Sequence, residues 1–393
     1  KATVKHIRQA GYNTNVIMGE ILDYPILNSR EIMVELIYKP STNNLMKIKV
    51  SDNTPNGFVN LSEDSDKNPF NFGHTSSEHD NDESISEFGA GYKEAFVGQA
   101  DKTTIYTYSD GEYHKIQFDI EKMMKKIDVN ESFQYEDTIV SKTEYEKEHE
   151  FKSGSSIIME ELVPGIIFDE NNLKEYIKRS YGKIIKNKEI NFLFKGKDGN
   201  LEKLSLEYFI PFEDKACIPF NTKSQLYAKK NGDVMTFLMT LEIDGQTKYY
   251  EYHNIKKPYF KEITKIRSFE YENWYGECNV DGKPIDIIAE INGTETQFCI
   301  QNFPTMGEVL LFKRGRQHGT YLPKSRNGSY NYSYLELEIY SKKVGKDLGM
   351  TVNKLLKLDK ENDLCKCTKT WITFIQKHHS YDKSTSKAVE KYI

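Results

Sequence analysis

The chain has 393 residues, of which 38 % are hydrophobic and 29 % are charged. This length predicts two or three domains, and the apolar content excludes a disordered protein. The net charge of −5, from 54 basic and 59 acidic side chains, excludes a uniformly basic nucleic-acid-binding surface but not a local basic patch. No apolar run approaches the ~18 residues that span a bilayer, and residues 1–8 lack the apolar core of a signal peptide. We therefore expect an intracellular protein, nuclear or cytoplasmic, without a membrane partner.

The cysteine and histidine pattern does not predict a metal site. Of the five cysteines, only Cys365 and Cys367 lie close together, and one intervening residue is fewer than zinc motifs usually have. The neighbouring His378 and His379 would point to different sides of a helix. We expect free thiols in a reducing compartment and no metal bound by these residues.

The first part of the chain is typical of mixed helices and strands. Apolar residues recur at helical spacing over 29–39, and Pro40 would end that helix. Residues 45–50 alternate apolar and lysine side chains, which predicts a strand. Residues 103–118 predict a hairpin around Asp110-Gly111. The polar, acidic stretch 60–87 is too long for a turn and predicts a functional loop.

The rest of the chain has a different pattern. Residues 157–162 predict a strand and residues 171–185 a helix. Short strand-like segments then recur from 190 to 339, separated by turns that contain Asp-Gly or Asn-Gly. A final helix is predicted over 364–378, with one apolar stripe. We place the domain boundary near 165–190, where the pattern changes.

Three short segments in the first hundred residues carry groups suited to a nucleotide. Glu35, on the predicted helix, could polarise a water molecule for attack on a phosphate. Asp52, where a strand ends, could accept a hydrogen bond from an exocyclic amine such as that of adenine. Gly89 and Gly91 would let backbone N–H groups approach phosphates, and Lys93 would add positive charge.

Each segment also has an ordinary structural interpretation. Glu35 and Lys39 could form a surface ion pair at i,i+4. Residues 52–57 could be only a turn, and Gly89-Ala90-Gly91 only a flexible loop. The order and spacing of all three segments together are harder to obtain by chance.

The series resembles the GHKL superfamily of ATPases, which includes gyrase, the ninety-kilodalton heat-shock chaperone, histidine kinases and MutL. In that family a helix carries Glu-x-x-x-Asn, a strand ends in Asp-x-Gly-x-Gly, and a Gly-x-Gly box follows the ATP lid. The resemblance implies ATP as the ligand. It implies a general base, an adenine site and a phosphate site, in that order at Glu35, at Asp52 with Gly57, and at Gly89, Gly91 and Lys93.

Further segments are similar to the microrchidia branch of this superfamily. Residues 71–77 resemble its lid segment Ser-Phe-Gly-Phe-Ser. Residues 153–158 resemble its Gly-Thr turn, with Ser155 in place of the phosphate-contacting Thr. Residues 351–354 resemble the transducer segment that sends a lysine to the γ-phosphate, which implies that role for Lys354.

The resemblance implies an α/β (α+β) fold of two domains. A GHKL-type sandwich would span 1–170, with its lid at 60–87, and a transducer-like β/α domain would span 171–393. The second domain contains a β-rich part, 205–300, that resembles nothing recognised.

Two departures from the family pattern lie in the nucleotide pocket. The magnesium-binding Asn of the family falls at Lys39, whose ammonium group has only donors and cannot be a metal ligand. Lys39 could instead bind the nucleotide by neutralising its phosphates as a point charge. The second motif is also expanded, because Thr54-Pro55-Asn56 precede Gly57. Magnesium dependence is therefore in doubt. Three outcomes stay open: a slow ATPase, a nucleotide-binding switch without hydrolysis, and a fold that has lost the nucleotide.

The function implied by the resemblance is an ATP-gated clamp that dimerises, hydrolyses ATP slowly and acts on DNA or a chromatin-like assembly. The alternative is a degenerate scaffold or interaction protein that keeps the shape of the fold. A local basic cluster could contact DNA phosphates, although a solvated hairpin is the simpler interpretation. Its members are Lys313, Arg314, Arg316, Lys324 and Arg326.

Overall fold

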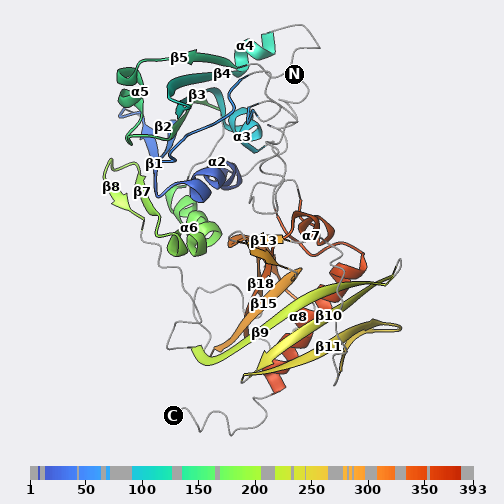
Figure 1. Ribbon diagram of the computed structural model, residues 1–393. Helices are drawn as coiled ribbons and strands as arrows, with labels where there is room; N and C mark the ends of the chain where they lie inside the picture. The colour runs from blue at the N-terminus through green and yellow to red at the C-terminus, as the bar shows by residue number, and fades with distance from the viewer. Residues whose placement is uncertain are drawn as a thin grey trace. The chain divides into compact units, whose positions relative to one another are not determined.

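The chain divides into two compact units, Lys1–Tyr208 and Phe209–Ile393, which are described separately below (Figure 1). The computed structural model describes residue 8 and residues 14–41, 44–62, 68–70, 91–125, 135–163, 169–204, 217–231, 234–243, 245–263, 278–280, 283–285, 287–296, 308–323, 333–351 and 355–381.

The first unit is built on an eight-stranded sheet with the order β5-β4-β3-β6-β2-β1-β7-β8. Neighbouring strands are antiparallel except β1 and β7, which run parallel. The strands are β1 (Glu31–Tyr38), β2 (Leu45–Asp52), β3 (Ala100–Ser109), β4 (Glu112–Asp119), β5 (Glu136–Ile139), β6 (Ser155–Leu162), β7 (Asn191–Lys195) and β8 (Leu201–Lys203).

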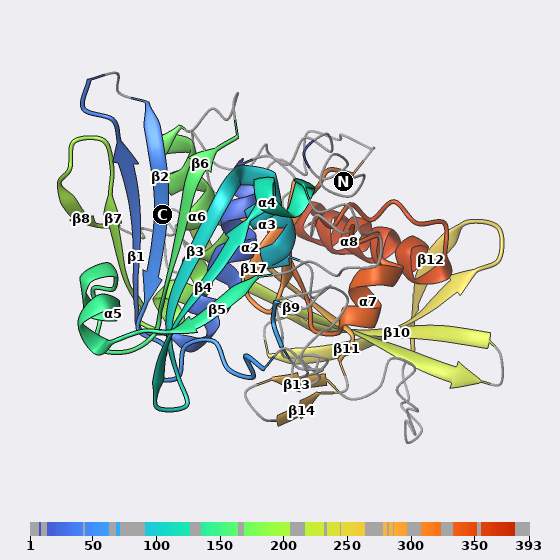
Figure 2. The same ribbon diagram turned by 90° about the horizontal axis from the view of Figure 1, so that it is seen from above.

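Helices cover this sheet unequally. The helices are α2 (Thr14–Asn28), α3 (Gly91–Gln99), α4 (Ile120–Lys125), α5 (Lys142–Glu148) and α6 (Glu170–Asn187). The apolar residues of α2, α3 and α6 share one core cluster with alternate residues of the central strands, so these helices pack on one face of the sheet (Figures 1 and 2). We call this the helix-covered face. Tyr145 of α5 packs with Tyr106 and Ile158 on the opposite face.

The helix predicted over 29–39 is wrong, because these residues form strand β1. Ile32, Val34 and Leu36 are buried in the core under the helices, as expected when side chains alternate along a strand. Met33 on the other face is also buried, and this two-sided burial mimics helical spacing. β1 lies between β2 and β7, and such a strand is rich in β-branched and apolar residues.

The other predicted elements of the first unit agree with the structure. The hairpin turns at Asp110 and Gly111, whose φ angles of 51° and 94° fit a two-residue type I′ turn. β2, β6 and α6 span the segments predicted for them. Asp169 caps α6, because its side chain accepts hydrogen bonds from the N–H groups of Asn171 and Asn172.

The second unit contains an eight-stranded sheet with the order β12-β11-β10-β9-β15-β18-β16-β17, and a separate pair, β13-β14. Its strands are β9 (Cys217–Asn231), β10 (Val234–Ile243), β11 (Gln246–Asn254), β12 (Pro258–Glu262), β13 (Cys278–Val280), β14 (Lys283–Ile285), β15 (Ala289–Thr296), β16 (Val309–Lys313), β17 (Arg316–Tyr321) and β18 (Ser333–Ile339). Its helices are α7 (Lys342–Asp347) and α8 (Asp363–Tyr381).

Helix α8 covers one face of this second sheet, as its apolar stripe predicts. Leu364, Thr368, Trp371 and Ile375 are all buried. The Trp371 Nε1–H group donates a hydrogen bond of 2.8 Å to the Ser224 hydroxyl on β9. The long C-terminal helix is therefore part of the core of the second unit.

The predicted fold class, an α/β sandwich followed by a β/α second domain, is confirmed. The two units divide after Tyr208, whereas the prediction placed the boundary at 170. The difference arises because α6, β7 and β8 belong to the first sheet and its core. No helix among the described residues is long and apolar enough to cross a membrane.

Candidate functional site

A row of polar side chains crosses three central strands of the first sheet. Asp52 on β2 pairs in register with Ser155 on β6, and Ser155 pairs with Thr107 on β3. Asp52 alternates with the core residues Ile48 and Val50, so all members of the row point to the helix-covered face. The Thr107 Oγ1 and Ser155 Oγ atoms are 2.8 Å apart, within hydrogen-bond distance.

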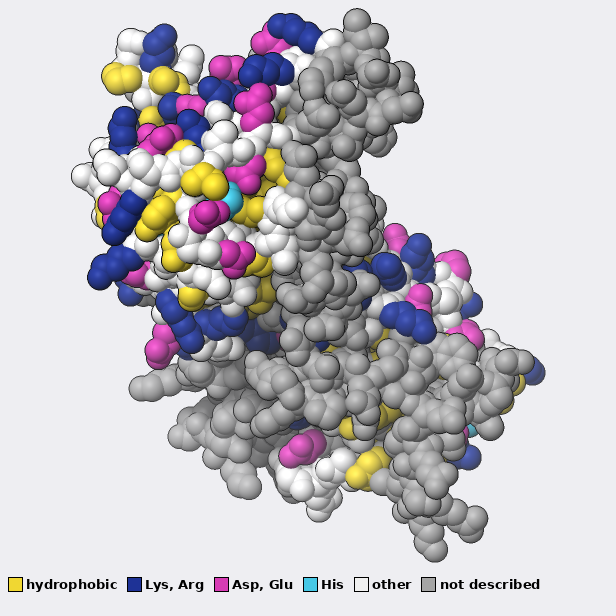
Figure 3. All heavy atoms as spheres, turned by 45° about the horizontal axis from the view of Figure 1, so that its top comes forward, with side chains coloured by type: hydrophobic (Ala, Val, Ile, Leu, Met, Phe, Trp, Pro, Cys, Tyr) yellow, Lys and Arg dark blue, Asp and Glu magenta, His cyan; other side chains and the backbone are white. Residues whose placement is uncertain are grey.

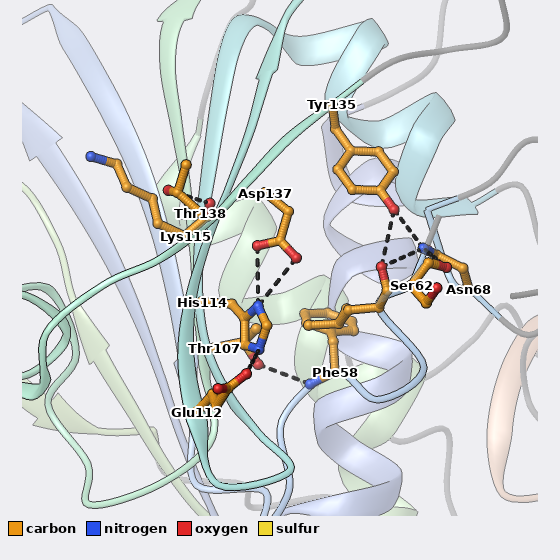
Figure 4. A network of polar contacts seen from close by, with 11 residues as sticks. Phe58, Ser62, Asn68, Thr107, Glu112, His114, Lys115, Tyr135, Asp137 and Thr138 are labelled. Atoms are coloured by element: carbon orange, nitrogen blue, oxygen red, sulfur yellow. Dashed lines mark hydrogen bonds and ion pairs between the residues drawn. The ribbon is translucent and has the colours of Figure 1, made fainter. Parts of the chain in front are cut away.

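The segment after β2 folds back over this row. The Phe58 N–H group donates a hydrogen bond of 2.9 Å to Thr107 Oγ1 (Figure 4). A Cβ atom at Gly57 would lie 2.1 Å from Thr107 Oγ1 and 2.5 Å from Ser155 Oγ, closer than real Cβ atoms approach. The sequence therefore needs glycine at this position so that the backbone can lie against the strands.

Asp52 is a buried carboxylate with few partners. It is 3 % exposed, and one carboxylate oxygen accepts a hydrogen bond of 2.9 Å from the Thr54 N–H group. Burial raises the pKa of Asp52 to about 6, since little solvent stabilises its charge. The buried Thr54 hydroxyl lies beside the same carboxylate and lowers its pKa, but the two do not form a hydrogen bond of normal geometry. The carboxylate therefore keeps acceptor capacity that a ligand could use.

Tyr24 links α2 to this segment. Its hydroxyl donates a hydrogen bond of 2.8 Å to the Gly57 carbonyl oxygen. Its ring stacks on Phe58, with centroids 5.4 Å apart and planes at 18°. Burial, together with the nearby charge of Asp52, raises the pKa of the Tyr24 hydroxyl above its ordinary value. Sequence reasoning missed this residue, although Glu20-x-x-x-Tyr24 lies within a helical apolar pattern.

Aromatic rings continue from Phe58 into the core. Phe58 packs on Phe70, and Phe70 packs on Phe118 and Tyr135, with centroid separations of 5.1, 5.5 and 5.8 Å. The amide nitrogen of the buried Asn68 side chain donates a hydrogen bond to the Tyr135 hydroxyl. Its amide oxygen accepts a hydrogen bond of 2.8 Å from the Phe70 N–H group. Figure 4 shows Asn68 and Tyr135 facing each other beside Phe58. The two described segments of the predicted lid, 60–62 and 68–70, both belong to its first part and are anchored to the core.

The structure corrects the environment predicted for Glu35. This residue is on a strand, and its side chain alternates with the core residues Val34 and Leu36, so it points to the face opposite Asp52. There it forms an ion pair of 2.5 Å with Lys195 on β7. Glu35 is therefore not brought together with the Asp52 row.

The interpretation of Lys39 changes for the same reason. Lys39 is exposed and follows β1 at the end of the β1–β2 hairpin where Tyr38 pairs with Leu45. Asp52 pairs with Ile32 at the other end, about 20 Å away at ~3.3 Å per residue. Lys39 therefore lies neither on a helix nor at the Asp52 row, and it does not mark a magnesium position.

The remaining predicted site residues differ in what the structure says of them. Asp52, Gly57 and Ser155 are brought together, with Ser155 beside Asp52. Gly91 and Lys93 begin α3, where only the backbone is described. Gly89, residues 63–67 and 71–87 of the lid, and Lys354 lie outside the described residues.

The predicted basic cluster does not form an exposed patch over its described members. Lys313 is 0 % exposed and Arg316 is 3 % exposed, so both are buried. Arg314 donates a hydrogen bond of 3.1 Å from Nε to the Tyr340 carbonyl oxygen. Lys324 and Arg326 lie outside the described residues.

On the first unit, basic and acidic side chains are interspersed over the face in Figure 3. The described ion pairs of this unit include Lys174 with Glu202 and Lys142 with Glu146. Among the residues that the structure describes, no group of three or more His, Cys, Asp or Glu side chains is placed to hold a metal ion.

One family model matches the part of the chain that contains most of the Asp52 row. Residues 26–151 match the family described as histidine kinase-, DNA gyrase B-, and HSP90-like ATPase. No curated protein matches the sequence. The matched segment contains Asp52, Gly57 and Thr107, and Tyr24 lies just before it. The match supports the GHKL superfamily for this part of the chain and implies that it binds ATP.

Proposed function

We propose that the first unit is an ATP-binding domain in which adenine is recognised by Asp52 on the helix-covered face of the sheet. The observation that carries this proposal is the buried Asp52 carboxylate, which among the described residues receives hydrogen bonding from Thr54 alone. A buried carboxylate without enough donors destabilises the folded protein, and such groups are frequent at binding sites. The exocyclic amine of adenine is a donor that would satisfy it.

This chemistry predicts a preference for ATP over GTP. Guanine carries a carbonyl oxygen where adenine carries its amine, so two acceptors would face each other at Asp52. A site that leaves a buried polar group unpaired discriminates strongly against the wrong ligand. Phe58 and Tyr24 supply aromatic surface close to the same carboxylate.

Access to Asp52 requires movement of the residues that cover it. Asp52 is 3 % exposed, and the segment that carries Gly57 and Phe58 is held to α2 by Tyr24. A nucleotide that reaches the carboxylate must therefore shift this segment or select a conformation in which it is already shifted. ATP would then act as a conformational ligand that changes the packing of α2 against the sheet.

We extend the proposal, by resemblance, to an ATP-gated clamp that dimerises, hydrolyses ATP slowly and acts on DNA or a chromatin-like assembly. In this wider proposal the general base is Glu20 on α2 and not Glu35, which lies on strand β1. Glu20 precedes Tyr24 by one helical turn and lies on the same side of the helix, at 8 % exposure. By the same resemblance, Lys354 is the candidate for the lysine that contacts the γ-phosphate.

A second candidate is a scaffold that has kept the fold and lost the nucleotide. The continuous contact of Tyr24, Phe58 and Phe70 favours it, because these rings already pack together over the Asp52 segment. In that case Asp52 would contribute only local polar contacts.

Isothermal titration calorimetry of the full chain with ATP and with GTP separates the two candidates. We expect wild type to bind ATP at least about tenfold more tightly than GTP, and Asp52→Asn to lose ATP binding. Glu35→Gln is the matched control, because it neutralises a carboxylate on the opposite face and should leave ATP affinity unchanged. The absence of ATP binding by wild type would exclude the proposal and favour the scaffold.

A further inference from the structure

The strongest disagreement between this chain and the resembled family concerns magnesium. In that family the metal-binding Asn follows a Glu by four residues on a helix. The helix that meets the Asp52 segment is α2, where Glu20 and Tyr24 have this spacing. By this spacing, Tyr24 and not Lys39 corresponds to the metal-binding Asn of the family. A tyrosine stands where the family has an amide oxygen.

The donor chemistry of Tyr24 does not suit magnesium. Mg²⁺ binds carboxylate, amide-type and water oxygens, and a neutral phenol is a weak ligand by comparison. The phenolate form is disfavoured, because burial and the charge of Asp52 raise the pKa of Tyr24. The hydroxyl proton is also donated to the Gly57 carbonyl oxygen at 2.8 Å.

The acidic residues of α2 do not replace the missing oxygen ligand. Asp23 is 3 % exposed and accepts a hydrogen bond of 2.6 Å from the Tyr181 hydroxyl on α6. Glu20 is then the one carboxylate of α2 on the Tyr24 side. Across the described residues, no group of three metal-ligating side chains is assembled. The residues present here do not fit a bound magnesium ion.

We propose that this chain binds ATP without a divalent cation and that Tyr24 is the residue that removes the requirement. The inference rests on the proposed function. In place of a ligand for the ion, Tyr24 supplies a direct link between α2 and the Gly57 segment. Tyr24 therefore holds α2 to the proposed adenine site directly, without a metal ion between them.

The test is a calorimetric titration of the full chain with ATP, once with excess MgCl₂ and once with EDTA. Wild type should bind with dissociation constants that agree within about threefold in the two buffers. Tyr24→Asn restores an amide oxygen and should gain a magnesium dependence of at least about fivefold. Tyr24→Phe is the matched control, because it keeps the ring on Phe58 and should remain independent of magnesium.

The outcomes separate the two proposals. If wild type binds ATP only with magnesium, or more than about fivefold better with it, the magnesium inference is overturned and ATP binding stands. If wild type binds in neither buffer, the proposed function fails and this inference with it. If wild type is indifferent to magnesium and folded Tyr24→Asn is too, the role of Tyr24 is wrong. Circular dichroism of each variant establishes that it is folded. If Tyr24→Asn does not fold, the comparison of buffers on wild type and Tyr24→Phe decides.

Discussion

Asp52→Asn should stabilise the ligand-free first unit at neutral pH while it removes ATP binding. The wild-type carboxylate is buried, and burial raises its pKa from the ordinary 3.8 to about 6. The folded state therefore holds a proton more tightly than the unfolded chain does. Ionisation of Asp52 above pH ~6 opposes folding, and this penalty fades as the pH falls toward ~4. Asparagine is neutral throughout and can still accept the hydrogen bond from the Thr54 N–H group.

The shift sets the size of the effect. A shift of about two pKa units corresponds to ~3 kcal/mol in the free energy of unfolding at neutral pH. This is an upper value, because the asparagine amide must also be buried without a full set of partners. We expect Asp52→Asn to be more stable than wild type by about 1–3 kcal/mol at pH ~7.5, and by markedly less at pH ~4.5.

Urea unfolding, followed by tryptophan fluorescence and by far-UV circular dichroism, can assign this stability difference to the first unit. Both tryptophans of the chain, Trp274 and Trp371, lie in the second unit, so their fluorescence reports on that unit. Far-UV circular dichroism reports on both units. The unfolding transition of the first unit is the one seen by circular dichroism and not by fluorescence. Asp52→Asn should move this transition to a higher urea concentration and leave the transition seen by tryptophan fluorescence unchanged. When the stability of wild type is subtracted from that of the variant, the pH-dependent contributions of all other titrating groups cancel, because the two proteins share these groups.

Two results would refute this reasoning. One is a variant less stable than wild type at neutral pH. The other is a stability difference that stays the same between pH ~4.5 and ~7.5, because that would mean the Asp52 carboxylate titrates normally in the folded protein.

Three further predictions test other parts of the structure. Gly57→Ala should destabilise the first unit by about 1–3 kcal/mol, because its Cβ has no room, whereas Gly345→Ala, with contacts of 3.4–3.5 Å to flexible side-chain ends, should be nearly neutral. Tyr181→Phe removes the donor to the buried Asp23 and should cost about 1–3 kcal/mol by urea unfolding; an unchanged midpoint would contradict this. Burial lowers the pKa of His149, so stability should fall as the pH drops below ~6.5, where the unfolded chain takes up the proton first. His149→Gln should lose that part of the pH dependence, and an identical slope in both proteins would count against it.

The elements that could be predicted from the sequence are those with strong local signals. Asp110-Gly111 occupies a two-residue turn that few other residue pairs accept, so the β3–β4 hairpin followed from the sequence. The three- and four-residue spacings of Leu364, Thr368, Trp371 and Ile375 likewise predict the buried side of α8. In both cases the signal lies within a short, continuous stretch of the sequence.

Strand β1 could not be told from a helix by such signals. Its apolar residues satisfy both periods, and the choice is made by β7, which pairs with β1 from about 160 residues away along the chain. The candidate site divides in the same way. Asp52 and Gly57 follow from a local motif at the end of a strand. Thr107 and Tyr24 reach the site only through strand register and helix packing, which no short segment encodes.

Hydrogen exchange of the full chain with and without saturating ATP tests most directly whether the nucleotide binds at Asp52. We expect ATP to slow exchange in the peptides that cover α2, residues 52–58 and the start of β6, and to leave the peptides of β7 and β8 unchanged. The same ATP should change nothing in Asp52→Asn. Protection that is absent from these segments in wild type, or that persists in the variant, would contradict an adenine site at Asp52.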